Sequence, residues 1–95
     1  MLPLETIVVN LAGPDNRWLR FEGVVVFTGS AAKENSASLP KYIMDDLVGF
    51  LRRTTLSQLD TAAGLEFLRD DMEELVRLRS NGRANTVLIK TLVVE

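Results

Sequence analysis

Two groups of acidic side chains are the residues of this 95-residue chain best suited to chemistry. Asp45 and Asp46 are adjacent, and four more acids occur within residues 70–74. Carboxylate pairs act as general acids and bases or bind divalent cations, but they need a concave, partly desolvated setting for either role. Neighbouring acids on an amphipathic helix usually form a solvated face, and Glu73 precedes Arg77 by the four residues of a favourable helical ion pair. We interpret both groups as structural, with a hydrolase or cation-dependent enzyme at Asp45 and Asp46 as the alternative.

The other common catalytic patterns are missing from the sequence. Histidine and cysteine are absent, which removes the commonest general base, the commonest metal ligand and thiol chemistry. The serines therefore have no histidine base, and the glycines are too isolated to form a phosphate or dinucleotide loop. Trp18 stands between Arg17 and Arg20, a pattern that can stack a nucleic-acid base, but a net charge of −2 supplies no basic field. We expect a protein that is not an enzyme and binds no cofactor, metal, small-molecule substrate or nucleic acid.

The composition is typical of one folded domain covering residues 1–95. Hydrophobic residues make up 46% of the chain and charged residues 25%, and this length suffices for one modest core. No apolar run is long enough to span a membrane, and no signal peptide is recognisable. The chain is therefore predicted to be soluble. Because it begins directly in a predicted strand, it also fits the soluble part of a longer membrane protein.

Strand periodicity occurs near both ends of the chain. Residues 4–11 and 17–28 alternate in hydrophobicity, and the turn-forming residues 12–16 between them predict an antiparallel hairpin. Residues 29–38 are small and polar without periodicity, which predicts a mobile loop. Residues 85–94 predict a third long strand.

Two amphipathic helices are predicted between the second and third strands. The first covers residues 39–53, and a capping-box pattern at 55–58 predicts a short helical turn after it. The second can be capped by Asp60 or Thr61 and is ended by residues 80–82. Its apolar stripe comprises the following residues: Leu65, Leu68, Met72, Leu75 and Val76, widened by Phe67 and Leu78.

The order β-β-α-α-β predicts an α+β fold with two helices on one face of a three-stranded or slightly larger sheet. Gly64, near the start of the second helix, would cost up to ~1 kcal/mol against alanine in a helix interior. Its presence indicates either close packing against a neighbouring segment or a harmless position in the first turn.

The sheet face away from the helices is predicted to be unusually apolar. It would carry Val8, Trp18, Val24, Val26 and alternate residues of the last strand. One interpretation is that scattered surface apolar residues are normal in strands. The other is an apolar patch for self-association or for a partner, with Trp18, Val24 and Val26 as candidate interaction residues.

Several segments resemble the periplasmic domain of the FliL family, the flagellar basal-body-associated proteins. The matching segments run along nearly the whole chain: residues 7–11, 17–28, Leu39-Pro40, Asp45, 55–59, Gly64, Leu68 and 87–95. The chain departs from the family at Met44, where many members carry arginine, and at Glu95, where glutamine is common. These departures suggest a divergent member or a paralogue.

The resemblance implies a non-enzymatic flagellar motor accessory that takes part in chemotaxis and cell motility. Family members are anchored in the inner membrane by an N-terminal helix, absent from this chain, and their soluble domain lies in the periplasm at the basal body and resembles the stomatin/SPFH fold. They associate with the flagellar stator proteins and are thought to form a ring around the stator's periplasmic segment, supporting torque or motility. The alternative function is a stomatin-like membrane scaffold unrelated to motility.

Overall fold

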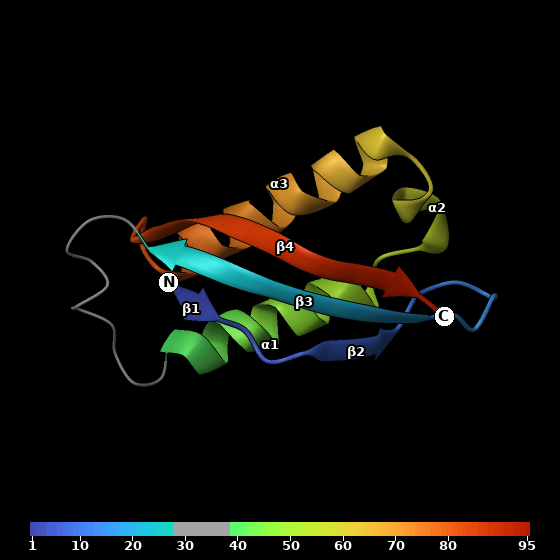
Figure 1. Cartoon of the computed structure of the whole chain (residues 1–95), viewed down its shortest axis with the longest axis horizontal. Coiled ribbons are helices and arrows are strands. Elements are labelled where there is room, and N and C mark those ends of the chain that lie inside the picture. The colour runs from blue at the N-terminus through green and yellow to red at the C-terminus, as the bar shows by residue number, and fades with distance from the viewer. Residues whose placement is uncertain (28–38) are drawn as a thin grey trace.

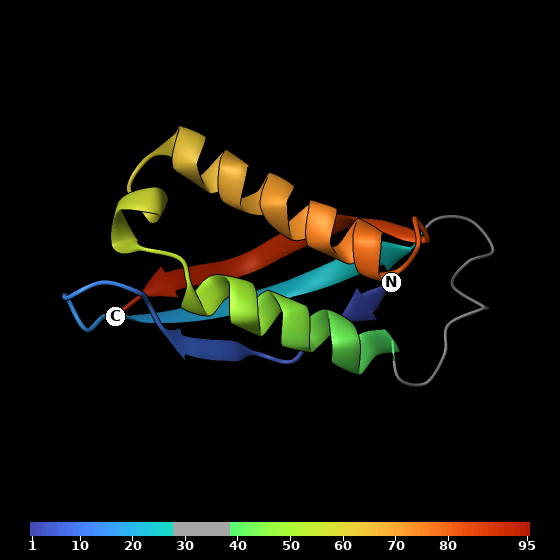
Figure 2. The same ribbon diagram turned by 180° about the vertical axis from the view of Figure 1, so that it is seen from behind.

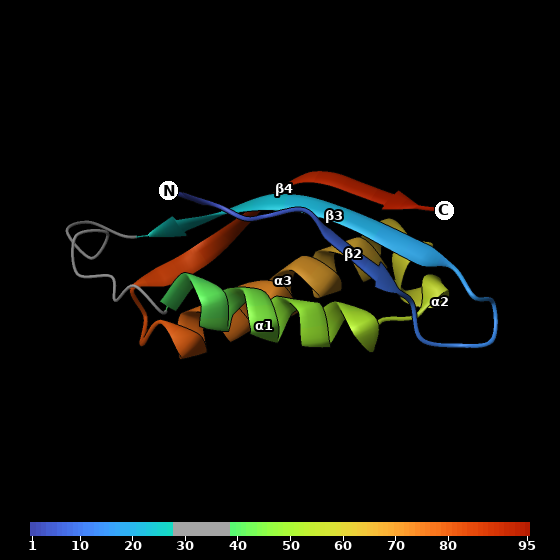
Figure 3. The ribbon, with the colours of Figure 1, turned by 90° about the horizontal axis from the view of Figure 1, so that it is seen from below.

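In the computed structural model, a four-stranded antiparallel sheet carries helices on one of its faces (Figures 1 and 3). The structure describes residues 1–27 and 39–95, so the loop predicted at 29–38 lies outside the described residues. The elements in chain order are β1 (Leu2–Pro3), β2 (Ile7–Asn10), β3 (Trp18–Phe27), α1 (Leu39–Arg52), α2 (Leu56–Leu59), α3 (Ala62–Arg79) and β4 (Ala84–Val94). The predicted α+β class is therefore confirmed.

The sheet is organised around β3, which is hydrogen-bonded along both of its edges. β1 and β2 pair in succession with one edge of β3, and β4 pairs along the other. The predicted hairpin of the first two long strands is confirmed as the β2–β3 pair. The strand predicted at residues 4–11 is shorter at both ends, and the chain before it forms β1, which the hydrophobic pattern did not predict.

The core lies between the helices and the inner face of the sheet. Alternation along β3 turns Leu19, Phe21 and Val25 toward the helices, where all three are fully buried. Side chains from α1 and α3 complete the same cluster: Leu39, Ile43, Leu47, Leu51, Leu68, Met72 and Val76. Burying each of these large apolar side chains contributes roughly 1.5–3 kcal/mol, so these stripes hold the helices to the sheet.

The second long helix departs from its predicted stripe at two positions. Phe67 and Leu78 are exposed, although they were expected to widen the buried face, and Leu65 is at the margin of exposure. At 100° per residue, Phe67 and Leu78 lie more than 100° around the helix from Met72, the middle of the buried stripe, so they are outside the surface that packs on the sheet. Leu65 lies close to that stripe, but Figures 1 and 2 show that α3 is near β4 at the helix's C-terminal end and diverges from β4 toward the helix's N-terminal end, where Leu65 lies.

Gly64 lies where the chain passes closely over α2. A Cβ atom at this position would clash with the carbonyl oxygen of Gln58. Its own N–H donates to the Oγ1 of Thr61, which caps the N-terminus of α3, at 2.9 Å. Of the two interpretations of Gly64, close packing against a neighbouring segment is correct.

Candidate interaction surfaces

The acids at 45 and 46 do not converge on a cavity. Asp46 on α1 accepts hydrogen bonds from Nε and Nη2 of Arg79 on α3, at 2.7 and 2.9 Å. The hydrogen bonds and the charge of Asp46 raise the pKa of Arg79 above its ordinary value. Arg79 also lies over the ring of Tyr42, with 5.2 Å between its guanidinium carbon and the ring centroid. These contacts join α1 to α3, whereas Asp45 is exposed.

The acids of α3 make contacts that differ from the predicted ion pair. Arg77 binds Glu74, three residues earlier, with 3.1 Å between its Nε and the carboxylate, and not Glu73. Glu73 instead accepts a hydrogen bond of 2.9 Å from the backbone N–H of Val87 on β4. In the described part of the chain, no group of three or more acids is arranged to hold a metal ion.

Trp18, Val24 and Val26 occupy the face of β3 that points away from the helices, but they differ in accessibility. Trp18 is 47% exposed at the start of the strand, and Val26 is half-buried. Val24 is only 4% exposed, yet it is not part of the core cluster beneath the helices. Its neighbours in register are Pro3 on β1 and Leu88 on β4.

The apolar residues of this face form two separate groups. Arg20 pairs in register with Val8 on β2 and Val93 on β4, so these two exposed valines lie near Trp18. The other group contains Val24, Val26 and Leu88, roughly 20 Å away from Trp18 at the ordinary rise of a strand. Arg20 and Glu22 lie between them on the same face.

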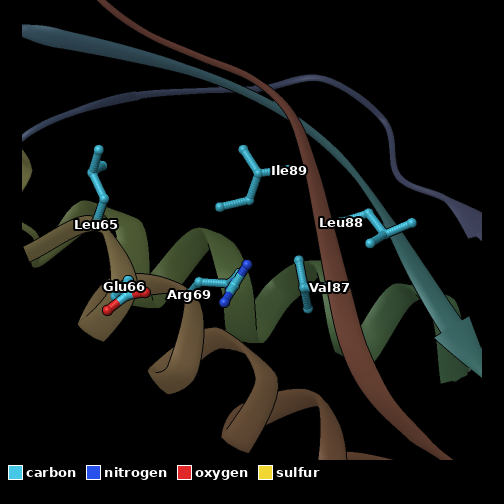
Figure 4. A pocket seen from close by; sticks show the side chains of 6 residues that line it. All are labelled: Leu65, Glu66, Arg69, Val87, Leu88 and Ile89. Carbon is cyan, nitrogen blue, oxygen red and sulfur yellow. The ribbon is translucent and has the colours of Figure 1, made fainter. Parts of the chain in front are cut away.

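The outer edge of β4 is a second candidate surface, which the sequence pattern did not identify. Among the described residues no strand pairs with this edge, although β4 has 11 residues. A groove of about 320 Å³ lies between the edge and the N-terminal half of α3. In Figure 4, Leu65 and Arg69 of α3 lie on one side of the groove and Ile89 of β4 lies on the other.

A second groove, of about 560 Å³, lies at the other edge of the sheet, between the N-terminal segment and α1. Its lining is mainly apolar, from Leu2, Leu4, Met44 and Val48. Both edges of the sheet thus carry apolar grooves overhung by a helix.

The arrangement defines a class of small α+β domain with an open antiparallel sheet and helices on one face. The family model described as "Flagellar basal body-associated protein FliL" matches residues 1–94, essentially the whole chain. The chain belongs to the FliL family, and it is therefore a flagellar basal-body-associated protein. The search of curated proteins found no match. Within the described residues, none of the helices combines the length and apolar character needed to cross a membrane.

Proposed function

We propose that this protein is a non-enzymatic motor accessory that associates with the flagellar stator units and supports torque or motility. The family match over residues 1–94 carries the proposal, because it assigns the chain to the basal body. In this proposal the domain lies on the periplasmic face of the inner membrane, is anchored there by a preceding helix and has a stomatin-like fold. Several copies assemble around the periplasmic segment of the stator.

The surface chemistry of the domain supports a role in contact rather than in catalysis. Trp18 is the largest exposed side chain on the open sheet face, and aromatic residues of this kind commonly anchor protein interfaces. Val8 and Val93 beside it extend the apolar area, while Arg20 supplies a polar contact in the same row. We assign the contact with the partner to the group around Trp18 and to Val26. Val24 is buried, and we assign it a supporting role within the sheet.

Deletion of the gene tests the motor role directly. We expect reduced swimming speed or reduced swarming on surfaces, because stator units would engage less stably or deliver less torque. The measurement is single-cell swimming speed and swarm expansion, with the wild-type gene restored as the control. Normal movement in liquid and on surfaces would contradict the motor role and favour a membrane scaffold unrelated to motility.

Crosslinking in cells tests the proposed contact surface. A photoreactive amino acid replaces Trp18, and a second strain carries it at Leu78, an exposed apolar position on the helical side of the domain. We expect capture of a stator protein from position 18 and not from position 78. Equal capture from both positions, or capture from neither, would reject the open sheet face as the contact surface.

A further inference from the structure

The backbone of β4 points hydrogen-bonding groups outward along the edge with which no described strand pairs, and one of them, the N–H of Val87, is taken by Glu73. Trp18 and Glu95 exchange both backbone hydrogen bonds, at 3.0 and 2.8 Å, so alternation turns the N–H and C=O groups of Val94 and Leu92 away from β3. The N–H of Val87 also points outward, since it binds Glu73, and Ile89 follows it by two residues. Lys90 is an extra residue between the pairs Ile89–Gly23 and Thr91–Glu22 and forms a β-bulge. Because of this bulge, the outward backbone groups before Lys90 and those after it lie on the same edge of β4.

The only other free sheet edge of the described chain is a poor match for this one. It is formed by β1 and β2, which contain two and four residues and are separated along β3, and β1 includes Pro3. A proline cannot donate to a new ladder, so this edge is short and interrupted. A head-to-tail contact between β4 of one copy and this edge of another would leave most of β4 unpaired. Another β4 has the same length as the exposed edge.

β4 is also complementary to itself in the antiparallel direction. If Ile89 of one copy faces Leu92 of another, the outward backbone groups of both positions pair with each other, and the two bulges lie side by side. The same register sets Leu88 opposite the second copy's Val93 on the open face, where these side chains are 46% and 44% exposed. The two-fold symmetry repeats each of these two pairs once, and both pairs are apolar.

We propose that two copies of this chain pair antiparallel through β4, with Ile89 opposite Leu92, to form a continuous eight-stranded sheet. The two-fold axis is perpendicular to the sheet, so the helices of both copies lie on one face. The second copy's Leu92 then enters the groove between Leu65 and Ile89, and so covers apolar surface that α3 leaves open. Lys90 of each copy lies beside the axis, and the repulsion between the two lysines weakens the contact. The pairing goes beyond the proposed function, because a two-fold contact closes on itself and does not generate a ring.

Charge substitutions on the open face test the pairing by sedimentation of the full chain over micromolar to millimolar concentrations. Leu88→Asp should weaken dimerisation at least tenfold, and combining it with Val93→Lys should restore most of the loss, since each aspartate then faces a lysine. Val8→Asp is the matched control, exposed on the same face but remote from the β4 edge, and it should leave dimerisation unchanged. A chain that stays monomeric, or equal effects of Leu88→Asp and Val8→Asp, would overturn the proposal.

Disulfide formation tests the register of the pairing. The sequence contains no cysteine, so only the introduced cysteines can form a disulfide. In the proposed pairing Leu88 and Val93 form a non-hydrogen-bonded pair, whose Cα atoms lie about 4.5 Å apart, within reach of a disulfide. Copies of the same position lie roughly 17 Å apart, too far to bond. A mixture of Leu88→Cys and Val93→Cys chains should therefore crosslink under mild oxidation, while each alone should not. Crosslinking of either chain alone at the rate of the mixture would reject the register.

Dimerisation of the purified chain is independent of cell movement, so normal motility after gene deletion would remove the proposed function and leave the pairing intact.

Discussion

At the scale of single residues, Val24 shows how accessibility separates a contact residue from a structural one. The alternating pattern of β3 correctly predicts that Trp18, Val24 and Val26 share a face, but it does not reveal which of them neighbouring strands cover. Pro3 and Leu88 flank Val24 in register, and its side chain is almost fully buried. A charged substitution at Val24 is therefore expected to destabilise the fold, and any loss of binding in such a variant would follow from that destabilisation.

Val24→Asp should lower the free energy of unfolding by roughly 3 kcal/mol or more, because it places an unpaired carboxylate in a buried apolar position. Trp18→Asp, at an exposed position of the same strand, should cost far less. Urea unfolding followed by circular dichroism measures both values. A loss no larger for Val24→Asp than for Trp18→Asp would mean that this face of β3 is more open at Val24 than its burial indicates.

Two glycines in helices should respond in opposite directions to alanine. Gly64→Ala should destabilise the protein by roughly 1–3 kcal/mol, because the new methyl group would meet the Gln58 carbonyl. Gly49→Ala, in the interior of α1, meets only the end of the Arg53 side chain at 3.6 Å and should stabilise the protein by up to about 1 kcal/mol. Thermal unfolding of both variants gives the two signs, and equal signs would contradict the described packing at Gly64.

Ser80 is fully buried where α3 turns into β4. Its Oγ accepts a hydrogen bond of 2.9 Å from the backbone N–H of Ala84. Ser80→Ala leaves that buried donor without a partner and should cost about 1–3 kcal/mol. Ser57→Ala, at an exposed serine of α2, serves as the control and should change stability by less than about 0.5 kcal/mol. Chemical denaturation distinguishes these outcomes, and a cost at Ser80 no larger than at Ser57 would show that water can replace the lost hydroxyl.

At the scale of elements, the sequence predicts the helices and strands well because their signals are local. The stripe of Ile43 and Leu47 in α1 and the alternation of Leu19 and Phe21 in β3 are complete within single segments. The same periodicity also excludes Phe67 and Leu78 from the buried face, because at 100° per residue both lie more than 100° around α3 from Met72, so including them in the stripe was wrong. The contact of Glu73, by contrast, could not be predicted, since its partner on β4 is reached only after the chain has turned.

At the scale of the whole molecule, the strand order was the part that the sequence did not reveal. Hydrophobic alternation identifies a strand but does not predict which strands pair with it. The pattern around Ile89 and Leu92 therefore does not show that one edge of β4 is unpaired. The candidate contact residues on β3 were found from alternation, whereas the groove beside Leu65 exists only because two segments distant in sequence meet. The sequence therefore predicts part of the apolar surface. It does not predict that this surface is divided into separate regions.

The central place of β3 also governs when the domain can become stable during synthesis. Its second edge is completed only by β4, and the hydrogen bond from Arg17 to the carbonyl of Glu95 joins residues 78 apart in the chain. Contacts between residues so far apart in the chain form late, because the entropy cost of closing a large loop comes before the contacts can stabilise the fold. A nascent chain therefore carries an unfinished sheet until residues 84–94 have left the ribosome.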